Sequence, residues 1–551
     1  MLLIALLSPM IPNIIYFIDA PSSGGRAFSV PTSHFWLGQI ITSFVLLCSP
    51  LFFGARPRTT LLCIAPFAVL SPVLAAYAII SGYPPSLLIL QVLRQATMEQ
   101  LSNFIPAIVV CATLSLGLGL TYVLLARWWG QETWVIKRSV RLVGLIALIG
   151  VLGKDIIPHG LQQGIPILVS RLSKLAPVSP YVLAIRLGLY GAVIPDRAIL
   201  LTQHTVTLDP AISDNEVCIL VLGESVRKRA MGLYNPQLDT TPLLAGRDLV
   251  IFTDATSCGT ASIQAVPILL TGRFPSNDEF LPFSELGLVG AFRLAGFKTH
   301  WLSSQKADGQ LTSFITAFST NAEERRYRNG RIEKPSSLNP DFKYDDTILP
   351  VLSELVSKPG RHFIVLQTLG SHLPYTRRYP SNFEKWPVSV SDRENMWRWF
   401  PPYNQAQRIA IDNAYYNSIY YTDWVLDQVI SILEASGRSS SMIYLSDHGD
   451  NDSSALEMPA NHGIVTPDIT NIPFFMWFSE SYRDRHADKL SVLQSNTTRR
   501  VSAQDVFSTL CDLNGLQLSA ANPTRSLASP SYTEHPRFVY TLDGRTVPLL
   551  P

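Results

Sequence analysis

Three short motifs, far apart in the 551-residue sequence, carry side chains that could together bind a metal ion and transfer a phosphoryl group. They are Gly223–Ser225, Thr256–Ala261 and Ser446–Gly449. Between them they supply a hydroxyl nucleophile, two carboxylates and an imidazole. Carboxylate oxygens and imidazole nitrogens bind zinc and similar divalent ions, and metal coordination favours the reactive alkoxide form of a hydroxyl. The motifs therefore predict a metal-dependent phosphotransferase.

Each side chain in these motifs is given one role. Glu224, Asp447 and His448 are the predicted metal ligands. Thr260 is predicted to complete a tetrahedral set and to act as the nucleophile. It precedes a predicted helix, Ala261–Leu270, whose N-terminal N–H groups would stabilise an alkoxide or a phosphate. Taken singly, these residues could be a strand-end cap, a buried hydrogen-bonding histidine or a helix cap, but their joint occurrence favours a metal site.

Two further histidines form a second tier of candidates. His372 follows another apolar run, and His462 lies in the loop Pro459–Gly463. An imidazole near the metal could bind phosphoryl oxygens or protonate a leaving group. The two histidines could also hold a second metal ion, and the alternative for His462 is a surface loop histidine.

The sequence of the second half of the chain predicts an α/β sandwich. Its four continuous apolar runs are typical of strands buried on both faces; they are Val217–Leu222, Phe363–Leu366, Met442–Leu445 and Ile472–Trp477. Helical patterns lie between them, at Asp346–Val356 and Ala414–Ala435. Strands that alternate with helices predict a largely parallel sheet, and ligands bind beyond the carboxyl ends of such strands. We therefore expect Glu224, His372 and Asp447 to meet at one edge. Pro374–Gln407 and the tail after Ser519 are predicted to be irregular.

The first half of the chain is apolar enough to enter a membrane. Five candidate spans are predicted from runs of about 20 apolar residues; they are Leu2–Ile18, Phe35–Gly54, Leu61–Ile80, Ile105–Leu125 and Val140–Ile157. We expect a transmembrane domain over residues 1–157, a bridging amphipathic segment over 158–205 and a catalytic domain over 206–551. A surface helix is predicted over Gly82–Phe104, with plain packing as the alternative.

Lysine and arginine residues set the predicted orientation. They gather between spans two and three and between spans four and five, and such loops stay in the cytoplasm. The catalytic domain then lies outside the membrane, which is the periplasm in a Gram-negative cell. A net charge of +2 gives no indication of nucleic-acid binding. The spacing of the six cysteines does not indicate a disulfide framework, and most of them are predicted to be small buried apolar residues.

The motifs resemble those of the phosphoethanolamine transferases of Gram-negative envelopes. The resemblance rests on Gly223–Arg227, Asp239–Pro242, Ser257–Ala261 and Ser446–Gly449. It implies five membrane helices followed by a sulfatase/alkaline-phosphatase-like domain, in the inner membrane with the catalytic domain in the periplasm. It implies zinc on Glu224, Thr260, Asp447 and His448, and a covalent phosphoethanolamine on Thr260. His372 and His462 would flank the phosphoryl group.

The resemblance also implies the substrates. Phosphatidylethanolamine would be the donor, which leaves diacylglycerol, and lipopolysaccharide or a glucan would be the acceptor. The run Trp301–Lys306 is similar to that of the lipopolysaccharide-core and glucan branches, and Gln305 and Lys306 become candidates for headgroup binding. The three cysteines of the second half are too few for the several disulfides typical of the lipid A branch.

Three alternative functions compete with this interpretation. A sulfatase that uses formylglycine needs Cys or Ser followed by x-Pro-x-Arg, and Cys258 is followed by Gly259–Ser262 instead. A phosphoglycerol transferase of the lipoteichoic-acid-synthase type shares five spans and a threonine nucleophile, and only the released headgroup would distinguish it. A non-catalytic membrane scaffold is disfavoured because the ligand set is complete.

Overall fold

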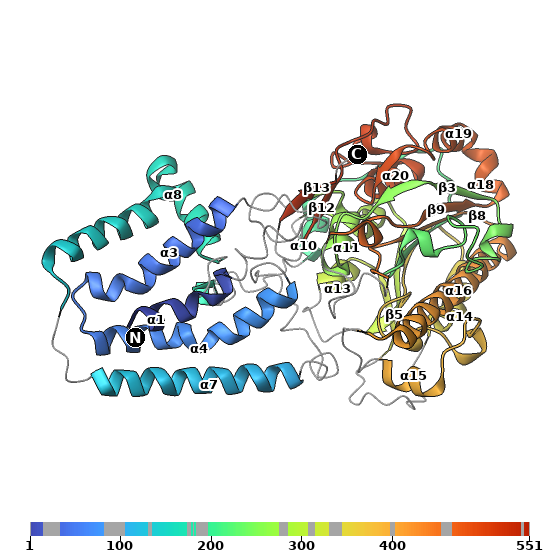
Figure 1. Cartoon of the computed structure of the whole chain (residues 1–551). Coiled ribbons are helices and arrows are strands. Elements are labelled where there is room, and N and C mark those ends of the chain that lie inside the picture. The colour runs from blue at the N-terminus through green and yellow to red at the C-terminus, as the bar shows by residue number, and fades with distance from the viewer. Residues whose placement is uncertain are drawn as a thin grey trace. The chain divides into compact units, whose positions relative to one another are not determined.

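In the computed structural model the chain folds into two units, Met1–Ala192 and Val193–Pro551, and Figure 1 colours the chain from blue to red along its length. The structure describes residues 2–14, 33–81, 105–129, 135–173, 178–179, 181–182, 197–274, 285–306, 314–329, 344–396, 403–452, 465–541 and 545–549.

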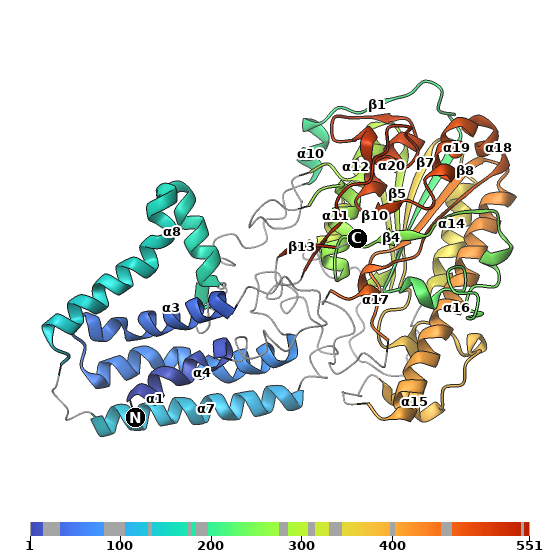
Figure 2. The same cartoon turned by 45° about the horizontal axis from the view of Figure 1, so that its top comes forward.

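The first unit is built from apolar helices. Those described are α1 (Leu2–Leu7), η1 (Ser8–Met10), α3 (Ser33–Phe52), α4 (Pro57–Ser81), α7 (Ile105–Trp128) and α8 (Arg138–Ser173). Helices α4 and α7 run side by side, and α3 packs against α4 and α8 (Figures 1 and 2). Large apolar side chains remain exposed on α7 and α8, such as Leu116 and Ile149. Exposed apolar surface of this extent is typical of a protein or membrane contact surface.

Two of the described helices are long and apolar enough to cross a membrane, over Pro57–Tyr77 of α4 and Val109–Trp128 of α7. The prediction of five spans is therefore not confirmed. In the described part of the chain, the first two predicted spans contain the shorter apolar helices Ala5–Ile14 and Ile40–Phe52.

The fifth predicted span differs from the structure in length. Val140–Ile157 contains three charged residues, Arg141, Lys154 and Asp155, which lower its hydropathy. Helix α8 continues through residue 157 to Ser173. The predicted domain boundary at residue 157 thus falls inside a continuous helix, and the proposed division of the chain at 157 and 205 stays a prediction. The helix predicted over Gly82–Phe104 lies outside the described residues.

A seven-stranded sheet forms the centre of the second unit, in the order β3-β9-β8-β2-β7-β5-β6. Its strands are β2 (Glu216–Gly223), β3 (Leu249–Phe252), β5 (Lys298–Lys306), β6 (Glu324–Asn329), β7 (His362–Gln367), β8 (Ser439–Ser446) and β9 (Phe474–Phe478). Strands β8, β2, β7, β5 and β6 run parallel, whereas β9 is antiparallel to β8 and β3 is antiparallel to β9. The predicted α/β sandwich with a largely parallel sheet is confirmed.

Helices cover both faces of this sheet, which is why its central strands are apolar along their whole length. Helices α14 (Leu349–Val356) and α16 (Gln405–Ala435) pack with Val217, Ile219 and Val221 of β2 on one face. On the other face lie α11 (Ser262–Thr271), α12 (Leu288–Leu294) and α20 (Asp505–Leu513) (Figure 2). There Phe292 of α12 stacks on Phe363 of β7, with ring centroids 3.8 Å apart.

Both regions predicted to be irregular contain regular structure. Pro374–Gln407 holds the short helices η6 (Tyr375–Arg377), η7 (Ser381–Phe383) and α15 (Val390–Asn395), and its last residues already belong to α16. A capping box starts α16, because the side chains of Asn404 and Gln407 each accept a hydrogen bond from the backbone N–H of the other. In the tail, β12 (Phe538–Tyr540) pairs with β13 (Thr546–Pro548). Tertiary contacts stabilise these elements, and their sequences have no periodic pattern.

Two buried histidines lie near the amino ends of β5 and β7, at the edge of the sheet opposite to Glu224. His300 Nε2 lies 3.1 Å from His362 Nδ1, and His300 Nδ1 lies 3.3 Å from Glu324 Oε2. Burial lowers the pKa of both imidazoles. That of His362 falls to about 4, and the positive charges of Arg438 and Lys298 and the neighbouring His300 contribute.

This pair predicts a loss of stability in acid. The folded-state pKa of His362 is about 4, below the unfolded value of about 6.5, so the unfolded chain takes up the proton first as the pH falls. We expect the melting temperature of the full chain in detergent to fall between about pH 6.5 and pH 4, and His362→Gln to reduce that fall. His535→Gln, at a half-buried histidine outside the pair, is the control. An unchanged pH dependence in His362→Gln would contradict this account.

Candidate active site

The sheet brings the three predicted ligands together. Glu224 follows β2, while Asp447 and His448 follow β8, and these neighbouring strands are in register up to Gly223 and Ser446. One ligand atom from each of the three residues lies within 4.8 Å of the other two. His448 Nε2 is 3.5 Å from Glu224 Oε1 and 3.7 Å from Asp447 Oδ2. All three side chains are buried.

Hydrogen bonds orient each ligand. Asp447 Oδ1 accepts from the backbone N–H groups of Ser225 (3.2 Å) and His448 (2.7 Å). Glu224 Oε1 accepts from the Ser225 hydroxyl at 2.7 Å. His448 Nδ1 donates to the carbonyl oxygen of Gly449 at 2.8 Å, so the lone pair of its neutral ring is on Nε2, the nitrogen that faces the carboxylates.

The charge of this cluster fits a divalent cation. Burial raises the pKa of Asp447, and the negative charge of Glu224 adds to the effect. Two carboxylates buried side by side repel each other, and a cation removes that repulsion. Oxygen ligands from Glu224 and Asp447 with a nitrogen ligand from His448 form a set that zinc accepts.

The hydroxyl that lies at the cluster is that of Ser262, the first residue of α11, rather than that of Thr260. Ser262 Oγ donates to Glu224 Oε2 at 2.9 Å and lies 3.3 Å from His448 Nε2. Thr260 Oγ1 donates instead to Gln264 Oε1 at 3.2 Å. The helix begins at Ser262, one residue later than predicted. The residue at its N-terminus, where negative charge is stabilised, therefore differs from the predicted one.

The motif before α11 is held against a strand from the tail. The backbone N–H of Tyr540 donates to the carbonyl oxygen of Cys258 (2.9 Å), and that of Thr260 donates to Tyr540 (3.3 Å). A Cβ on Gly259 would lie 2.5 Å from the backbone nitrogen of Ala265, so only glycine fits this approach. Burial raises the pKa of the Cys258 thiol, which disfavours a thiolate nucleophile.

The predicted substrate-binding residues differ in where the structure places them. Gln305 reaches the cluster, because its Nε2 donates to Glu224 Oε2 (3.3 Å) and to the carbonyl oxygen of Thr368 (2.8 Å). Lys306 ends β5, and the structure describes only its backbone. His462 lies outside the described residues.

His372 lies in a loop that is fixed against Glu224. Ser371 donates its backbone N–H to the carbonyl oxygen of Glu224 at 2.9 Å. The buried carboxylate of Asp345 accepts from the N–H groups of Leu369 (2.7 Å) and Gly370 (3.1 Å). His372 Nδ1 donates to the carbonyl oxygen of Leu373 at 2.6 Å, which fixes the orientation of the ring.

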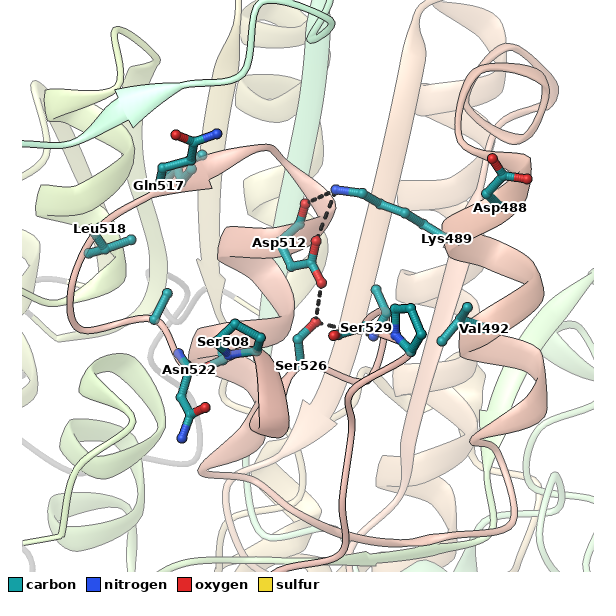
Figure 3. A pocket seen from close by; sticks show the side chains of 15 residues that line it. Asp488, Lys489, Val492, Ser508, Asp512, Gln517, Leu518, Asn522, Ser526 and Ser529 are labelled. Carbon is teal, nitrogen blue, oxygen red and sulfur yellow. Dashed lines mark hydrogen bonds and ion pairs between the residues drawn. The ribbon is translucent and has the colours of Figure 1, made fainter.

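A separate cavity of about 470 Å³ lies between α19 (Ala487–Ser495), α20 and β11 (Leu516–Gln517) (Figure 3). Inside it, Lys489 Nζ lies 3.0 Å from Asp512 Oδ1, and the Ser526 hydroxyl donates to Asp512 Oδ2 at 2.6 Å. None of its lining residues belongs to the cluster of Glu224. We therefore do not assign this cavity to the active site.

The second unit is an α/β sandwich whose strand ends carry a cluster that fits a divalent cation, and comparison with protein families identifies its family. The family model described as sulfatase matches residues 216–516, and the chain belongs to the sulfatase family. The match spans the strands and loops that carry the cluster, although the x-Pro-x-Arg sequence of formylglycine sulfatases is absent after Cys258.

Curated relatives in this family are phosphoethanolamine transferases. The chain is 26% identical over 343 residues to phosphoethanolamine transferase EptC of Escherichia coli, which covers 60% of this chain and 56% of the relative. It is 31% identical over 297 residues to EptA of Helicobacter pylori, which covers 51% and 50%. The resemblance read from the motifs is confirmed. The chain spans about half the length of the curated relatives that it matches.

Solved structures extend the likeness in fold. The integral membrane lipooligosaccharide phosphoethanolamine transferase A of Neisseria meningitidis superposes with a TM-score of 0.62 at 20% identity, over 96% of this chain and 97% of that one. The periplasmic domain of the Escherichia coli EptC, in complex with zinc, superposes with a TM-score of 0.53 at 25% identity, over 63% and 95%. The first likeness shows a shared fold that includes the helical first unit.

The cluster predicts how metal binding and stability change when one carboxylate is removed. We expect Asp447→Asn to weaken zinc binding at least about 100-fold, more than is usual for loss of an outer hydrogen-bond partner. Without metal, the same variant should melt at a higher temperature than the metal-free wild type, because one of two buried charges is gone. Zinc titration against a chromophoric chelator and melting in EDTA measure the two effects.

Asp248→Asn is the matched control, because Asp248 is 82% exposed and its side chain pairs with Arg483 rather than with the cluster. It should change neither the affinity for zinc nor the melting temperature. Zinc binding of wild-type strength in Asp447→Asn would remove Asp447 from the ligand set.

Proposed function

We propose that this protein transfers phosphoethanolamine from phosphatidylethanolamine to lipopolysaccharide or an envelope glucan, through a covalent serine intermediate at a zinc site. One observation carries the proposal: the Ser262 hydroxyl, at the N-terminus of α11, contacts both Glu224 and His448. A hydroxyl beside a metal-ligand set has the arrangement required of an activated nucleophile. The related transferases supply the identity of the group transferred.

The ligands proposed for zinc are Glu224, Asp447 and His448, with Ser262 as the fourth. This replaces Thr260 in both of its predicted roles, because the Thr260 hydroxyl donates to Gln264. Zinc bound here would lower the pKa of the serine hydroxyl and offset negative charge on the phosphoryl oxygens. The N-terminal N–H groups of α11 would stabilise the same charge.

The reaction is proposed to take two displacement steps. Ser262 Oγ forms a bond to the phosphorus of the donor, the bond from phosphorus to the diacylglycerol oxygen breaks, and a proton passes to that oxygen. An acceptor hydroxyl or phosphate oxygen then forms a bond to the phosphorus, the bond from phosphorus to Ser262 Oγ breaks, and Oγ takes up a proton, which restores the serine. His372 and His462 are proposed to bind the phosphoryl oxygens or to supply the proton, since imidazole serves both purposes near neutral pH.

Headgroup binding is proposed for Gln305 and Lys306. Gln305 already donates to Glu224 and to Thr368, so its carbonyl oxygen is available to accept from an ammonium group of the donor. Lys306 follows it on the same strand, and its positive charge would suit a phosphate rather than an amine.

The proposed location is the inner membrane, with several membrane-crossing helices and the catalytic unit in the periplasm. Helices α4 and α7 contain the two described segments fit to cross a membrane, and the lysine and arginine residues between predicted spans set this orientation. A membrane location gives direct access to a phospholipid donor.

Intact-mass spectrometry of the full chain after incubation with phosphatidylethanolamine tests the nucleophile. We expect a covalent adduct of about 123 Da in the zinc-loaded wild type, as nucleophilic catalysis requires. Ser262→Ala should lose the adduct and at least about 10³-fold of the transfer rate. Thr260→Ala should keep the adduct, because only its hydrogen bond to Gln264 is removed.

The opposite result, an adduct in Ser262→Ala that is absent from Thr260→Ala, would restore Thr260 as the nucleophile. Phosphatidylglycerol is the second donor in this test. An adduct formed only from phosphatidylglycerol would replace the proposed activity with phosphoglycerol transfer.

A further inference from the structure

The turn that carries Glu224 is held from outside by one tyrosine of α16. Tyr415 is 1% exposed. Its hydroxyl donates to the carbonyl oxygen of Ser225 at 2.8 Å and accepts from the backbone N–H of Arg227 at 2.8 Å. One phenol group thus closes the turn between Ser225 and Arg227, directly after the first metal ligand.

This turn has an unusual backbone conformation at Ser225. Its φ angle of +60° is the one positive value among the described residues other than glycine. A left-handed conformation of this kind costs free energy and persists only where the surroundings enforce it. The same residue orients both carboxylates, because its N–H donates to Asp447 Oδ1 and its hydroxyl donates to Glu224 Oε1.

The other ligand loop is tied to the same tyrosine through Arg227. The buried guanidinium group lies over the Tyr415 ring, 4.1 Å from its centroid, and Nη1 donates to the carbonyl oxygen of Asp450 at 3.2 Å. Asp450 Oδ2 accepts from the Tyr375 hydroxyl at 2.9 Å. Asp450 lies two residues after His448, so α16 is linked to the loops on both sides of the cluster.

We propose that Tyr415 is a positioning residue of the metal centre, whose hydroxyl maintains the Ser225 conformation and thereby the orientation of both carboxylates. The inference rests on the proposed metal site and assigns no contact with substrate. Without the hydroxyl, the Ser225 carbonyl oxygen and the Arg227 N–H lose their partner in a buried place. The left-handed conformation of Ser225 then loses two of the hydrogen bonds that stabilise it.

Tyr415→Phe in the full chain tests this role, because it removes the hydroxyl and leaves a ring of the same shape under Arg227. We expect zinc to bind about 10-fold to 100-fold more weakly, the usual effect of losing a group that orients a ligand. After exchange of zinc for Co²⁺, the visible absorption bands should shift, since they report ligand geometry. A role in core packing alone would leave those bands unchanged.

Tyr421→Phe is the matched control on the same helix. Tyr421 is also 1% exposed, and its hydroxyl accepts from the backbone N–H of Asp346 at 3.1 Å, in the short helix η5 (Asp345–Ile348), which carries no proposed zinc ligand. This variant should lower the melting temperature by a similar amount while it keeps the affinity for zinc and the Co²⁺ spectrum of the wild type.

Wild-type zinc affinity and Co²⁺ bands in Tyr415→Phe would overturn the inference while the proposed function stands. Failure of the wild type to bind zinc would overturn the metal site itself, and the inference with it.

Near-UV circular dichroism checks that each variant is folded. Should Tyr415→Phe unfold, Tyr375→Phe removes the hydroxyl that donates to Asp450 Oδ2 and should weaken zinc binding by a smaller factor. An unchanged affinity there overturns the inference as well.

Discussion

The active site depends on keeping two negative side chains buried beside one imidazole. Glu224 and Asp447 have lost most of their contact with water, and each acts on the charge of the other. Burying two like charges in this way costs free energy unless oriented hydrogen-bond donors and a cation offset it. The backbone N–H groups of Ser225 and His448, with the hydroxyls of Ser225 and Ser262, supply the donors. Much of the surrounding structure holds these donors in place.

The parallel sheet makes this gathering of charge feasible. Strands β2 and β8 are neighbours although more than half of the second unit separates them in sequence, and both end at the same edge. Strand β7 adds the loop of His372 on the other side of β2. These strands are buried along their whole length, and sites built on strands hold their side chains more precisely than sites on loops alone.

The sequence allowed the strand ends to be located, and with them Glu224, Asp447 and His448, because apolar runs followed by polar residues are a strong local signal. It did not allow the start of α11 to be located well enough. Helix boundaries depend on tertiary contacts as well as on local propensity, and here Tyr540 fixes the backbone just before the helix. With that small difference, the hydroxyl that contacts the cluster is that of Ser262 rather than that of Thr260. The role of Tyr415 could not be predicted, since it depends on a helix packing against a turn that is distant in sequence.

The pairing of Gly259 with Tyr540 also affects the order in which parts of the site can fold during synthesis. The segment that leads into α11 receives its backbone partner from β12, so this contact is absent until the ribosome has translated residue 540. The cluster of Glu224, Asp447 and His448 can form earlier, because β8 precedes β12 in the chain. In a growing polypeptide all three residues of the cluster are thus present before the strand that pairs with the segment preceding α11.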